Sequence, residues 1–578
     1  MNSILTAAPV TASLDDPFYY LANFRFVLGW VGERHGDLLT PEEHDFLAAF
    51  DALPRASGAL LVRMVMRKGE CFRTSKLAYA EIGDPERALA PLLAAGWVEA
   101  EPALSLAELF HLLRLAELRQ ALAEEAAAAG LPRSASKAAL CEALTPRLSG
   151  ARRLGDWWPG AGEALSGEHI VRLAVMPLCD RLRLMFFGNL RQDWAEFVLT
   201  ELGLQRFEQV ELTPDSRAFR RREEVDAYLA LDRLRERLEE GESPAALAEE
   251  VPVLPEDNAW LAQRRGRLWF RLAQAAERET RYALALRLYE LGGEGPGGQV
   301  QARIRRLRLL ERQGEHELAH ALASVLAAPQ ASEQETQALE RLLPRLRRRL
   351  GLPSTPRRLE ATPTRLDLCL PCPASDIWSG VECAVRDHLH RPHAPVYYVE
   401  NTLLSGLFGL LCWPALFAPL AGAFFHPFHR GPADLYHDDF VARRRERFDA
   451  CLTRLDDGSH AEAILSTWHA KHGLASPFVH WEGLDEALLE QALACLPAQH
   501  LKACFERLLS DLKANRAGLP DLIQFLPGED KGPRYRLIEV KGPGDRLQDN
   551  QRRWLAFFRQ HGVPAVVCHV TWQDGAAP

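Results

Sequence analysis

The chain has 578 residues, which is too many for one hydrophobic core and implies two to four domains. Hydrophobic residues make up 47% of it and charged residues 25%, a composition that excludes a largely disordered chain. The formal net charge of −9 argues weakly against nucleic-acid binding without excluding it, because phosphate affinity depends on local clusters of Lys and Arg.

Three features indicate the compartment. The first residues show no basic region followed by a long apolar stretch, so they do not form a secretory signal. The eleven cysteines are odd in number and scattered, which is typical of reduced thiols, and the pair Cys369 and Cys372 has no second pair at zinc-ribbon spacing. The apolar run 403–423 is interrupted by Pro414 and Pro419, which favours a buried core segment over a membrane span. We therefore expect a cytoplasmic protein with no membrane partner.

The N-terminal segment, 1–103, is expected to be a helical DNA-binding region. It repeats aromatic and aliphatic residues at helical spacing and then interleaves basic with apolar residues. Such a pattern can place cations on one face of a helix while the other face is buried. The candidate DNA-binding residues are Arg63, Arg67, Lys68, Arg73 and Lys76. A solvated helix face is the alternative, and composition alone favours it.

Residues 104–150 carry a short two-helix pattern. A Gly-Leu-Pro turn separates the halves, and Ser134 or Ser136 is a natural N-cap for the second helix. The leucine spacing, the turn and Lys137 resemble the SAP module, a small helix-extended-helix DNA-binding unit. The resemblance makes Arg133 and Lys137 further candidates for DNA binding, and a plain helical hairpin is the alternative.

The next segment, 151–360, is rich in Ala, Leu, Arg and Glu and has helical periodicity. Two of its stretches, 282–289 and 317–326, recur about 35 residues apart, the period of tetratricopeptide-like helix pairs. We expect a TPR-like helical scaffold, with unrelated helices as the alternative. Pro353 and Pro356 mark a linker into the last domain.

The last segment, 361–578, changes to an α/β pattern. Strand-like runs occupy 535–541 and 565–570, and an amphipathic helix is expected between them, at 549–561. The predicted fold class is therefore mainly α over the N-terminal two thirds, followed by a C-terminal α/β domain.

This domain carries the residues that indicate chemistry. If the segment after Asp521 pairs with the strand 535–541 as a hairpin, Asp521 and Glu539 come side by side, and strand alternation puts Lys541 on the same face as Glu539. Two carboxylates and the Val540 carbonyl supply the hard oxygen ligands that Mg²⁺ or Mn²⁺ prefers. Bound metal activates water for attack on a phosphate, and the lysine stabilises the developing charge.

The Asp…Glu-x-Lys arrangement is the active-site signature of the restriction-endonuclease-like nucleases. The strings 518–522 and 537–547 around it resemble the VRR-NUC domain of that superfamily. In that family a glutamine on the following helix belongs to the active-site motif. The resemblance therefore implies a role for Gln551, and an ordinary polar position on a helix is the alternative.

An upstream string extends the likeness. Residues 399–403 and 407–413 resemble the VRR-NUC region of the Fanconi-associated nucleases, in which an early glutamate supplies a further metal ligand. The resemblance implies that Glu400 has this role. Glu382, on an expected helix, is the competing residue, because related nucleases often use a glutamate of their first helix.

The same family likeness reaches the N-terminal segments. Residues 18–24 and 62–81 resemble the DNA-binding region of these nucleases, and residues 186–194 resemble a further string of the same family. The resemblance implies the order DNA-binding region, SAP-like pair, helical repeats and nuclease (361–578). The ubiquitin-binding zinc finger of animal members is not seen here, so recruitment by ubiquitin is unsupported and a bacterial, nucleoid-associated protein is expected.

The resemblance implies a structure-specific DNA nuclease. Its expected reactions are 5′-flap cleavage and 5′-to-3′ exonuclease action on branched DNA, in repair that includes interstrand crosslinks, with one or two Mg²⁺ or Mn²⁺ ions. Branched or flapped DNA is the expected partner. A four-way-junction resolvase and a non-catalytic DNA-binding scaffold are the alternatives, and the complete acid, acid and lysine set disfavours the scaffold.

Overall fold

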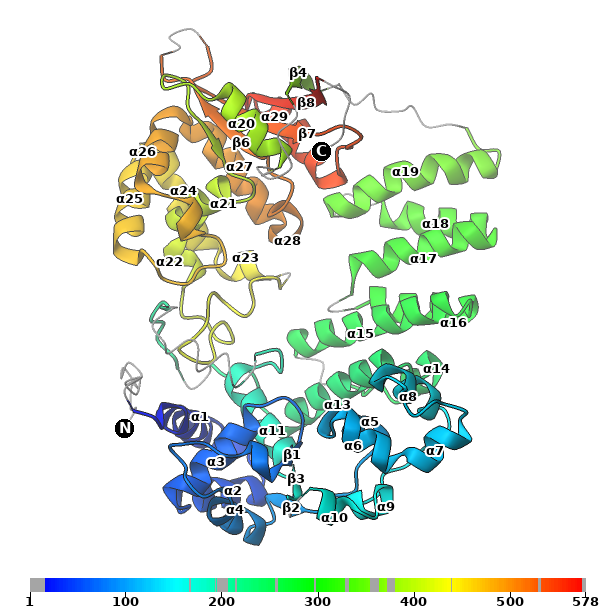
Figure 1. Ribbon diagram of the computed structural model, residues 1–578. Coiled ribbons are helices and arrows are strands. Elements are labelled where there is room, and N and C mark those ends of the chain that lie inside the picture. Colours follow the sequence, from blue (N-terminus) through cyan, green and yellow to red (C-terminus); the bar gives the residue numbers. More distant parts are fainter. Residues whose placement is uncertain are drawn as a thin grey trace. The chain divides into compact units, whose positions relative to one another are not determined.

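The computed structural model describes residues 16–165, 168–192, 194, 206–213, 216–254, 258–295, 298–327, 332–353, 363–371, 380–437, 439–528 and 532–573. The chain divides into two compact units (Figure 1). The first comprises Met1–Gln205 and Thr213–Val225, and the second comprises Arg206–Leu212 and Asp226–Pro578.

The first unit begins with helices around a small antiparallel sheet. The helices are α1 (Tyr19–His35), α2 (Pro41–Asp51), α3 (Arg55–Val65), α4 (Pro85–Ala94) and α11 (Met176–Phe187). The strands are β1 (Cys71–Arg73), β2 (Val98–Ala100) and β3 (Ile170–Leu173). The strand β3 lies between β1 and β2, and α11 packs against α1. The predicted boundary at residue 150 therefore does not separate compact units, because the strand at 170–173 completes a sheet that begins near residue 71.

The predicted SAP-like pair lies within this unit. Its helices are α5 (Leu106–Leu112), α6 (Leu115–Ala121), α7 (Ala123–Ala128) and α8 (Lys137–Leu144), followed by the short α9 (Leu154–Trp157) and α10 (Ala161–Ala164). The Ser136 hydroxyl accepts a hydrogen bond from the Ala139 N–H at 3.2 Å, which confirms one of the two predicted caps. Gly130 adopts a left-handed conformation, with φ of 74°, in the predicted turn.

The helical scaffold makes up the first part of the second unit. Its helices are α13 (Arg222–Glu239), α14 (Pro244–Glu249), α15 (Ala259–Arg278), α16 (Tyr282–Gly293), α17 (Val300–Gln313), α18 (His316–Leu326) and α19 (Glu333–Arg349). From α15 to α19, each helix packs against the next, as Figure 1 shows. The two recurring stretches of sequence lie on α16 and α18, the second helices of successive pairs. The predicted helical scaffold is thus confirmed.

The α/β domain is built on a mixed five-stranded sheet. Its strands are β4 (Thr364–Leu370), β5 (Val396–Tyr398), β6 (Leu522–Phe525), β7 (Tyr535–Lys541) and β8 (Ala565–Trp572), in the order β4-β8-β7-β6-β5. The strands β4, β8 and β7 are parallel, whereas β6 and β5 are antiparallel to their neighbours. The helix α29 (Asp549–Gln560) connects β7 to β8. The predicted strands and the helix between them are confirmed.

The remaining helices of this domain pack on the sheet or on one another. They are α20 (Val381–Leu389), α21 (Leu403–Leu411), α22 (Trp413–Leu416), α23 (Phe440–Arg443), α24 (Arg445–Asp457), α25 (His460–Lys471), α26 (Glu486–Cys495), α27 (Ala498–Ser510) and α28 (Leu512–Asn515). Every residue of α21 is buried, which confirms a core role for the apolar run. Within the described residues, no helix is both long enough and apolar enough to cross a membrane.

Side-chain alternation on β7 decides which face carries the charged residues. Tyr535 and Leu537 pack into the larger core with α21, α24 and α27, whereas Ile538 and Val540 pack into a smaller core with α20. Since alternate residues of a strand share a face, Glu539 and Lys541 lie on the side of the larger core. They occupy the C-terminal end of β7, where the apolar core gives way to polar side chains.

Candidate active site

A short antiparallel hairpin brings the two central carboxylates together. The register pairs Leu522 of β6 with Ile538 of β7, so Asp521, one residue earlier, stands opposite Glu539. The Oδ2 atom of Asp521 accepts a hydrogen bond from the Val540 N–H at 2.7 Å. The two acids are therefore neighbours in the structure, as the sequence predicts.

The three charged side chains of this hairpin are almost completely buried. Glu539 is 1% exposed, Asp521 6% and Lys541 8%. The Lys541 Nζ lies 2.8 Å from Oε1 of Glu539, which is an ion-pair distance. This ion pair compensates one buried negative charge, whereas the second carboxylate, Asp521, adds a further negative charge to the same buried site.

Burial and mutual repulsion shift the titration of both acids. Burial raises the pKa of Asp521 to about 6, against the opposing hydrogen bond from Val540 and the charge of Lys541. Burial and the nearby charge of Asp521 raise the pKa of Glu539 to about 7, against the opposing effect of Lys541. Both carboxyl groups therefore titrate near neutral pH, as in sites that bind a cation or transfer a proton.

The early glutamate follows directly after the edge strand β5. The Tyr398 hydroxyl donates to Oε2 of Glu400 at 2.5 Å, and Nδ2 of Asn401 lies 3.3 Å from Oε1 of the same carboxylate. Asn401 also accepts a hydrogen bond from the Leu519 N–H at 3.3 Å, which ties this loop to the segment leading into Asp521. Sequence reasoning missed Tyr398 and Asn401, although both flank the predicted ligand.

Glu382 remains the competitor of Glu400. It lies in the first turn of α20 and, like Glu400, raises the pKa of Asp521 through its charge. Both carboxylates are therefore close enough to act on the hairpin. The choice between them as the early ligand stays a prediction in favour of Glu400.

The donor set fits a hard divalent cation. Asp521, Glu539 and Glu400 present carboxylate oxygens, and the single ammonium of Lys541 leaves the two buried acids with an excess negative charge that a cation would compensate. As the side chains stand, no three acidic, histidine or cysteine groups within the described ranges are close enough together to hold one ion. Glu400 is exposed and its carboxylate is hydrogen-bonded to Tyr398, so it is the member that would have to move.

Gln551 has a local structural role at the start of α29. Its Oε1 atom accepts the Gln548 N–H at 2.8 Å, which completes a capping box at the helix N-terminus. The side chain is thus used by its own helix in this structure. Its participation in the active site stays a prediction.

The basic stretch near the N-terminus was expected to form one face of a helix, and this prediction is wrong. Arg63 lies in the last turn of α3 and Arg73 on β1, and residues 66–70 form a turn because the chain reverses there to start the small sheet. Arg63 pairs with Glu81 at 2.7 Å, and Arg73 is buried between two glutamates, Glu117 at 2.8 Å and Glu168 at 2.5 Å.

These pairs divide the candidate DNA-binding residues into two groups. Arg63 and Arg73 are engaged in ion pairs within the first unit. The remaining candidates are exposed, and they are Arg67, Lys68, Lys76, Arg133 and Lys137. Two of them touch backbone carbonyls nearby: Arg67 donates to that of Lys76 at 2.8 Å and Lys137 to that of Leu113 at 3.0 Å. The exposed group is therefore the one available to phosphates.

Comparison with known families assigns three regions. The family model "FAN1, HTH domain" matches residues 18–99, "Fanconi anemia-associated nuclease SAP domain" matches 103–157, and "VRR-NUC domain" matches 455–572. The predicted SAP-like pair and the predicted VRR-NUC nuclease are confirmed. Nucleases of the VRR-NUC type depend in general on a divalent metal.

Relatives and solved structures agree with these matches. The chain is 54% identical to the Fanconi-associated nuclease 1 homolog of Pseudomonas aeruginosa over 97% of each chain. It is 25% identical to the homolog of Oryza sativa subsp. japonica, covering 96% of this chain and 62% of that one. A crystal structure of paFAN1, described as bound to DNA with a two-nucleotide 5′ flap and a gap, matches with a TM-score of 0.89 and 53% identity, covering 97% of this chain and all of the other. The chain belongs to the Fanconi-associated nuclease family and is a nuclease.

Proposed function

We propose that this nuclease hydrolyses phosphodiester bonds at 5′ flaps and other branched DNA, with 5′-to-3′ exonuclease action, in DNA repair that includes interstrand crosslinks. The observation that carries the proposal is the buried set of Asp521, Glu539 and Lys541, in which two carboxylates share one ammonium group. DNA is the proposed partner, and a bacterial cytoplasm, at the nucleoid, is the proposed location.

The metal would be held by Asp521, Glu539 and Glu400, with the Val540 carbonyl as a fourth oxygen. One or two Mg²⁺ or Mn²⁺ ions would supply Lewis acidity to the attacking water and to the phosphate. Lys541 holds its ammonium group beside Glu539, where it stabilises the negative charge that builds on the phosphate oxygens. Water attacks phosphorus in line, the bond to the 3′ oxygen breaks, and the products are a 3′-hydroxyl and a 5′-phosphate.

The choice of flapped DNA rests on relatives. Two solved structures, 53% identical to this chain and described as paFAN1, contain DNA with a 5′ flap of one or two nucleotides. Recognition of a branch requires contacts to more than one duplex arm. The exposed basic residues of the first unit suit this role, because phosphate contacts position DNA without reading its sequence.

Cleavage of labelled substrates tests the proposal. The purified protein should cut 5′-flap DNA in Mn²⁺ or Mg²⁺ and release a 5′-phosphorylated product, and chelator should stop the reaction because the acids alone cannot activate water. A four-way junction of the same arm sequences serves as the comparison. Faster cutting of the junction would favour a resolvase instead, and cutting that persists in chelator would refute the metal mechanism.

Exposed cations of the first unit should set the affinity for DNA. Replacing Arg67, Lys68 and Lys76 together with Gln should lower the slope of log affinity against log salt by about 0.9 for each lost phosphate contact. Fluorescence anisotropy of flap DNA in Ca²⁺ measures this slope. The matched control replaces Arg445, Arg447 and Arg454, which are exposed on α24, and should leave the slope unchanged. An unchanged slope in the triple variant would remove these residues from the DNA-binding surface.

A further inference from the structure

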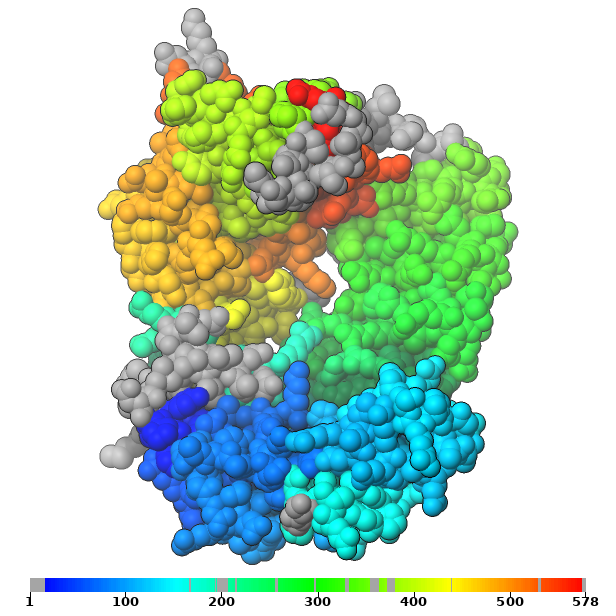
Figure 2. Space-filling model, in the orientation of Figure 1, coloured from blue at the N-terminus to red at the C-terminus, as the bar shows by residue number. Residues whose placement is uncertain are grey.

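One face of α19 contacts the nuclease domain through side chains spaced four residues apart. They are Glu333, Gln337 and Arg341, and a spacing of four places them on one side of a helix. Figure 2 shows the green surface of the helical scaffold meeting the red surface of the nuclease segment. The helical scaffold and the nuclease domain thus share a specific polar contact.

The strongest part of this contact is a bidentate ion pair. Nη1 and Nη2 of Arg341 lie 2.6 Å from Oδ2 and Oδ1 of Asp549, the first residue of α29. The planar guanidinium matches both carboxylate oxygens, which fixes direction as well as distance. The hydrogen bonds from Arg341 lower the pKa of Asp549, so this carboxylate is ionised at neutral pH.

The neighbouring side chains extend the contact. Nε2 of Gln337 donates to the Asp549 carbonyl at 3.3 Å, and its Oε1 accepts from Arg553 of α29. Glu333 forms a bidentate pair with Arg507 of α27, at 2.9 and 2.6 Å. The scaffold therefore holds the beginning of α29 and the end of α27 at the same time.

The start of α29 packs closely against the segment that leads to Asp521. Gly518 has a φ of 88°, and a Cβ there would lie 2.7 Å from Cγ of Asn550 and 2.9 Å from its backbone carbon. Asn550 follows Asp549 directly, so any shift of Asp549 moves the residue packed against Gly518. The N–H of Leu519, the next residue, is the group that binds Asn401 beside Glu400.

We propose that Arg341 is a positioning residue for the metal-binding carboxylates. Its ion pair with Asp549 holds Asn550 against Gly518, and this contact sets the position of Asp521 and of the loop that carries Glu400. The helical scaffold thus contributes to metal affinity without touching the metal. The inference rests on the proposed function, because it takes Asp521 and Glu400 as the residues that hold the metal.

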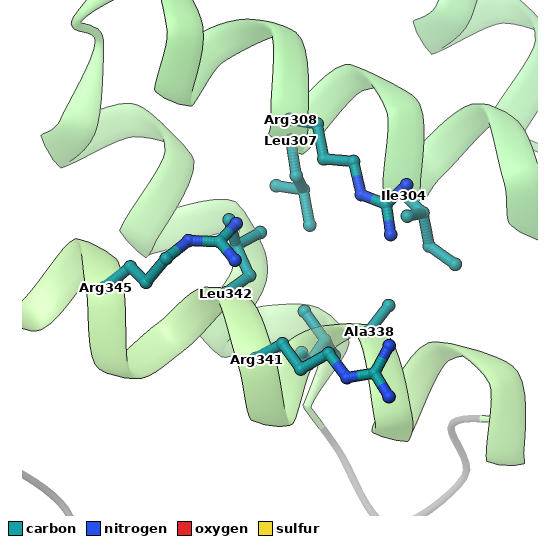
Figure 3. Close-up of a pocket in the computed structure, with 8 residues that line it drawn as sticks. Ile304, Leu307, Arg308, Ala338, Arg341, Leu342 and Arg345 are labelled. Atoms are coloured by element: carbon teal, nitrogen blue, oxygen red, sulfur yellow. The ribbon is translucent and has the colours of Figure 1, made fainter. Parts of the chain in front are cut away.

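Arg345 provides a matched control on the same helix. It forms a bidentate pair with Glu311 of α17, at 2.9 and 2.8 Å. The two arginines are similarly exposed, at 48% for Arg341 and 51% for Arg345, whereas Glu311 is more buried than Asp549. Figure 3 shows Arg341 and Arg345 rising from α19 beside a groove of about 250 Å³ between α17 and α19. The Arg345 pair lies wholly within the scaffold, so its loss should leave the nuclease hairpin unchanged.

Manganese binding by the full-length protein tests the proposal. Isothermal titration calorimetry with Mn²⁺ should show a dissociation constant about tenfold larger for Arg341→Gln, because groups that orient metal ligands commonly contribute at least a factor of ten to metal affinity. Asp549→Asn should weaken binding similarly, and the double variant should be no worse than either single one. Arg341→Lys should recover part of the affinity. Arg345→Gln should bind like the parent, and flap-DNA affinity in Ca²⁺ should stay within about twofold for all variants.

Hydrogen exchange separates this inference from the proposed function. Arg341→Gln should speed amide exchange in residues 518–526 of the metal-free protein, whereas Arg345→Gln should not. If the parent binds no Mn²⁺ but this difference in exchange is present, the proposed metal site fails while the mechanical link stands. Equal Mn²⁺ affinity and equal exchange in Arg341→Gln and the parent, or equal losses in both arginine variants, would overturn the inference.

Discussion

Replacing Glu539 with Gln should lower flap cleavage by about a thousandfold, because the variant loses the charge of the most buried carboxylate of the site. The amide keeps the size of the side chain but is neutral and presents only one oxygen, so it neither compensates a divalent cation nor pairs with Lys541. Single-turnover cleavage of labelled flap DNA in saturating Mn²⁺ measures the loss. DNA affinity in Ca²⁺ should change little, since we propose that the exposed cations of the first unit bind the DNA.

The controls for this variant also address the early ligand. Glu506→Gln, at an exposed position of α27, should cut DNA at the parental rate. Glu400→Gln should lose most of the activity, and Glu382→Gln should lose little, if Glu400 holds the metal. The reverse order would assign the early ligand to Glu382. Full activity in Glu539→Gln would contradict the proposal that the hairpin of β6 and β7 carries the metal-binding carboxylates.

Metal binding and protein stability should depend on pH in opposite directions. The pKa of Glu539 is raised to about 7 and that of Asp521 to about 6, so a metal must displace protons from both at lower pH. Mn²⁺ affinity should therefore rise about tenfold per pH unit between roughly pH 6 and 7, more steeply below pH 6, and level off above pH 8. Isothermal titration calorimetry across this range measures how Mn²⁺ affinity changes with pH. An affinity that does not change with pH would contradict the raised pKa values of Glu539 and Asp521.

The same raised pKa values affect the metal-free protein. A carboxyl group whose pKa is higher in the folded state than in the unfolded state stabilises the fold when protonated. For Glu539 this stabilisation is complete below about pH 4.5 and is lost as the pH rises through about 7. The difference between its ordinary pKa of 4.5 and about 7 corresponds to at most about 3 kcal/mol of unfolding free energy.

Glu539→Gln should remove this dependence, because an amide does not ionise. The metal-free variant should melt at about the parental temperature at pH 4 and at a higher temperature at pH 8. Differential scanning calorimetry in chelator measures both. If the melting temperatures of the variant and the parent changed with pH in the same way, ionisation of Glu539 would not destabilise the folded protein.

Local sequence patterns were enough to predict the hairpin of β6 and β7. The strand 535–541 shows apolar alternation, and its neighbours, the helix after residue 549 and the strand from 565, have clear periods of their own. Because side chains of a strand alternate between faces, the positions of Glu539 and Lys541 followed directly, and the pairing with Asp521 needed only a short connection. The helical scaffold was equally predictable, since its periodicity is local.

Contacts between distant segments were not predictable in this way. The strand at 170–173 inserts between β1 and β2, about 70 to 100 residues away, and no local pattern indicates such a pairing. The same insertion explains why Arg73 is not a surface cation: its guanidinium lies between Glu117 and Glu168, from two other parts of the first unit. A basic residue in a sequence shows its charge but not its partners.

By itself, the sequence determined that Glu539 and Lys541 share one face of a strand and that a helical scaffold precedes this domain, because strand alternation and helical periodicity act over a few residues. The nuclease assignment came from the resemblance of the surrounding strings to a known family. Only the tertiary structure decided which charges are buried, that Tyr398 and Asn401 hold Glu400, and that Arg341 reaches Asp549 some 200 residues away. These contacts depend on how whole helices and strands pack against one another, and that packing is a property of the complete domain rather than of any local run of residues.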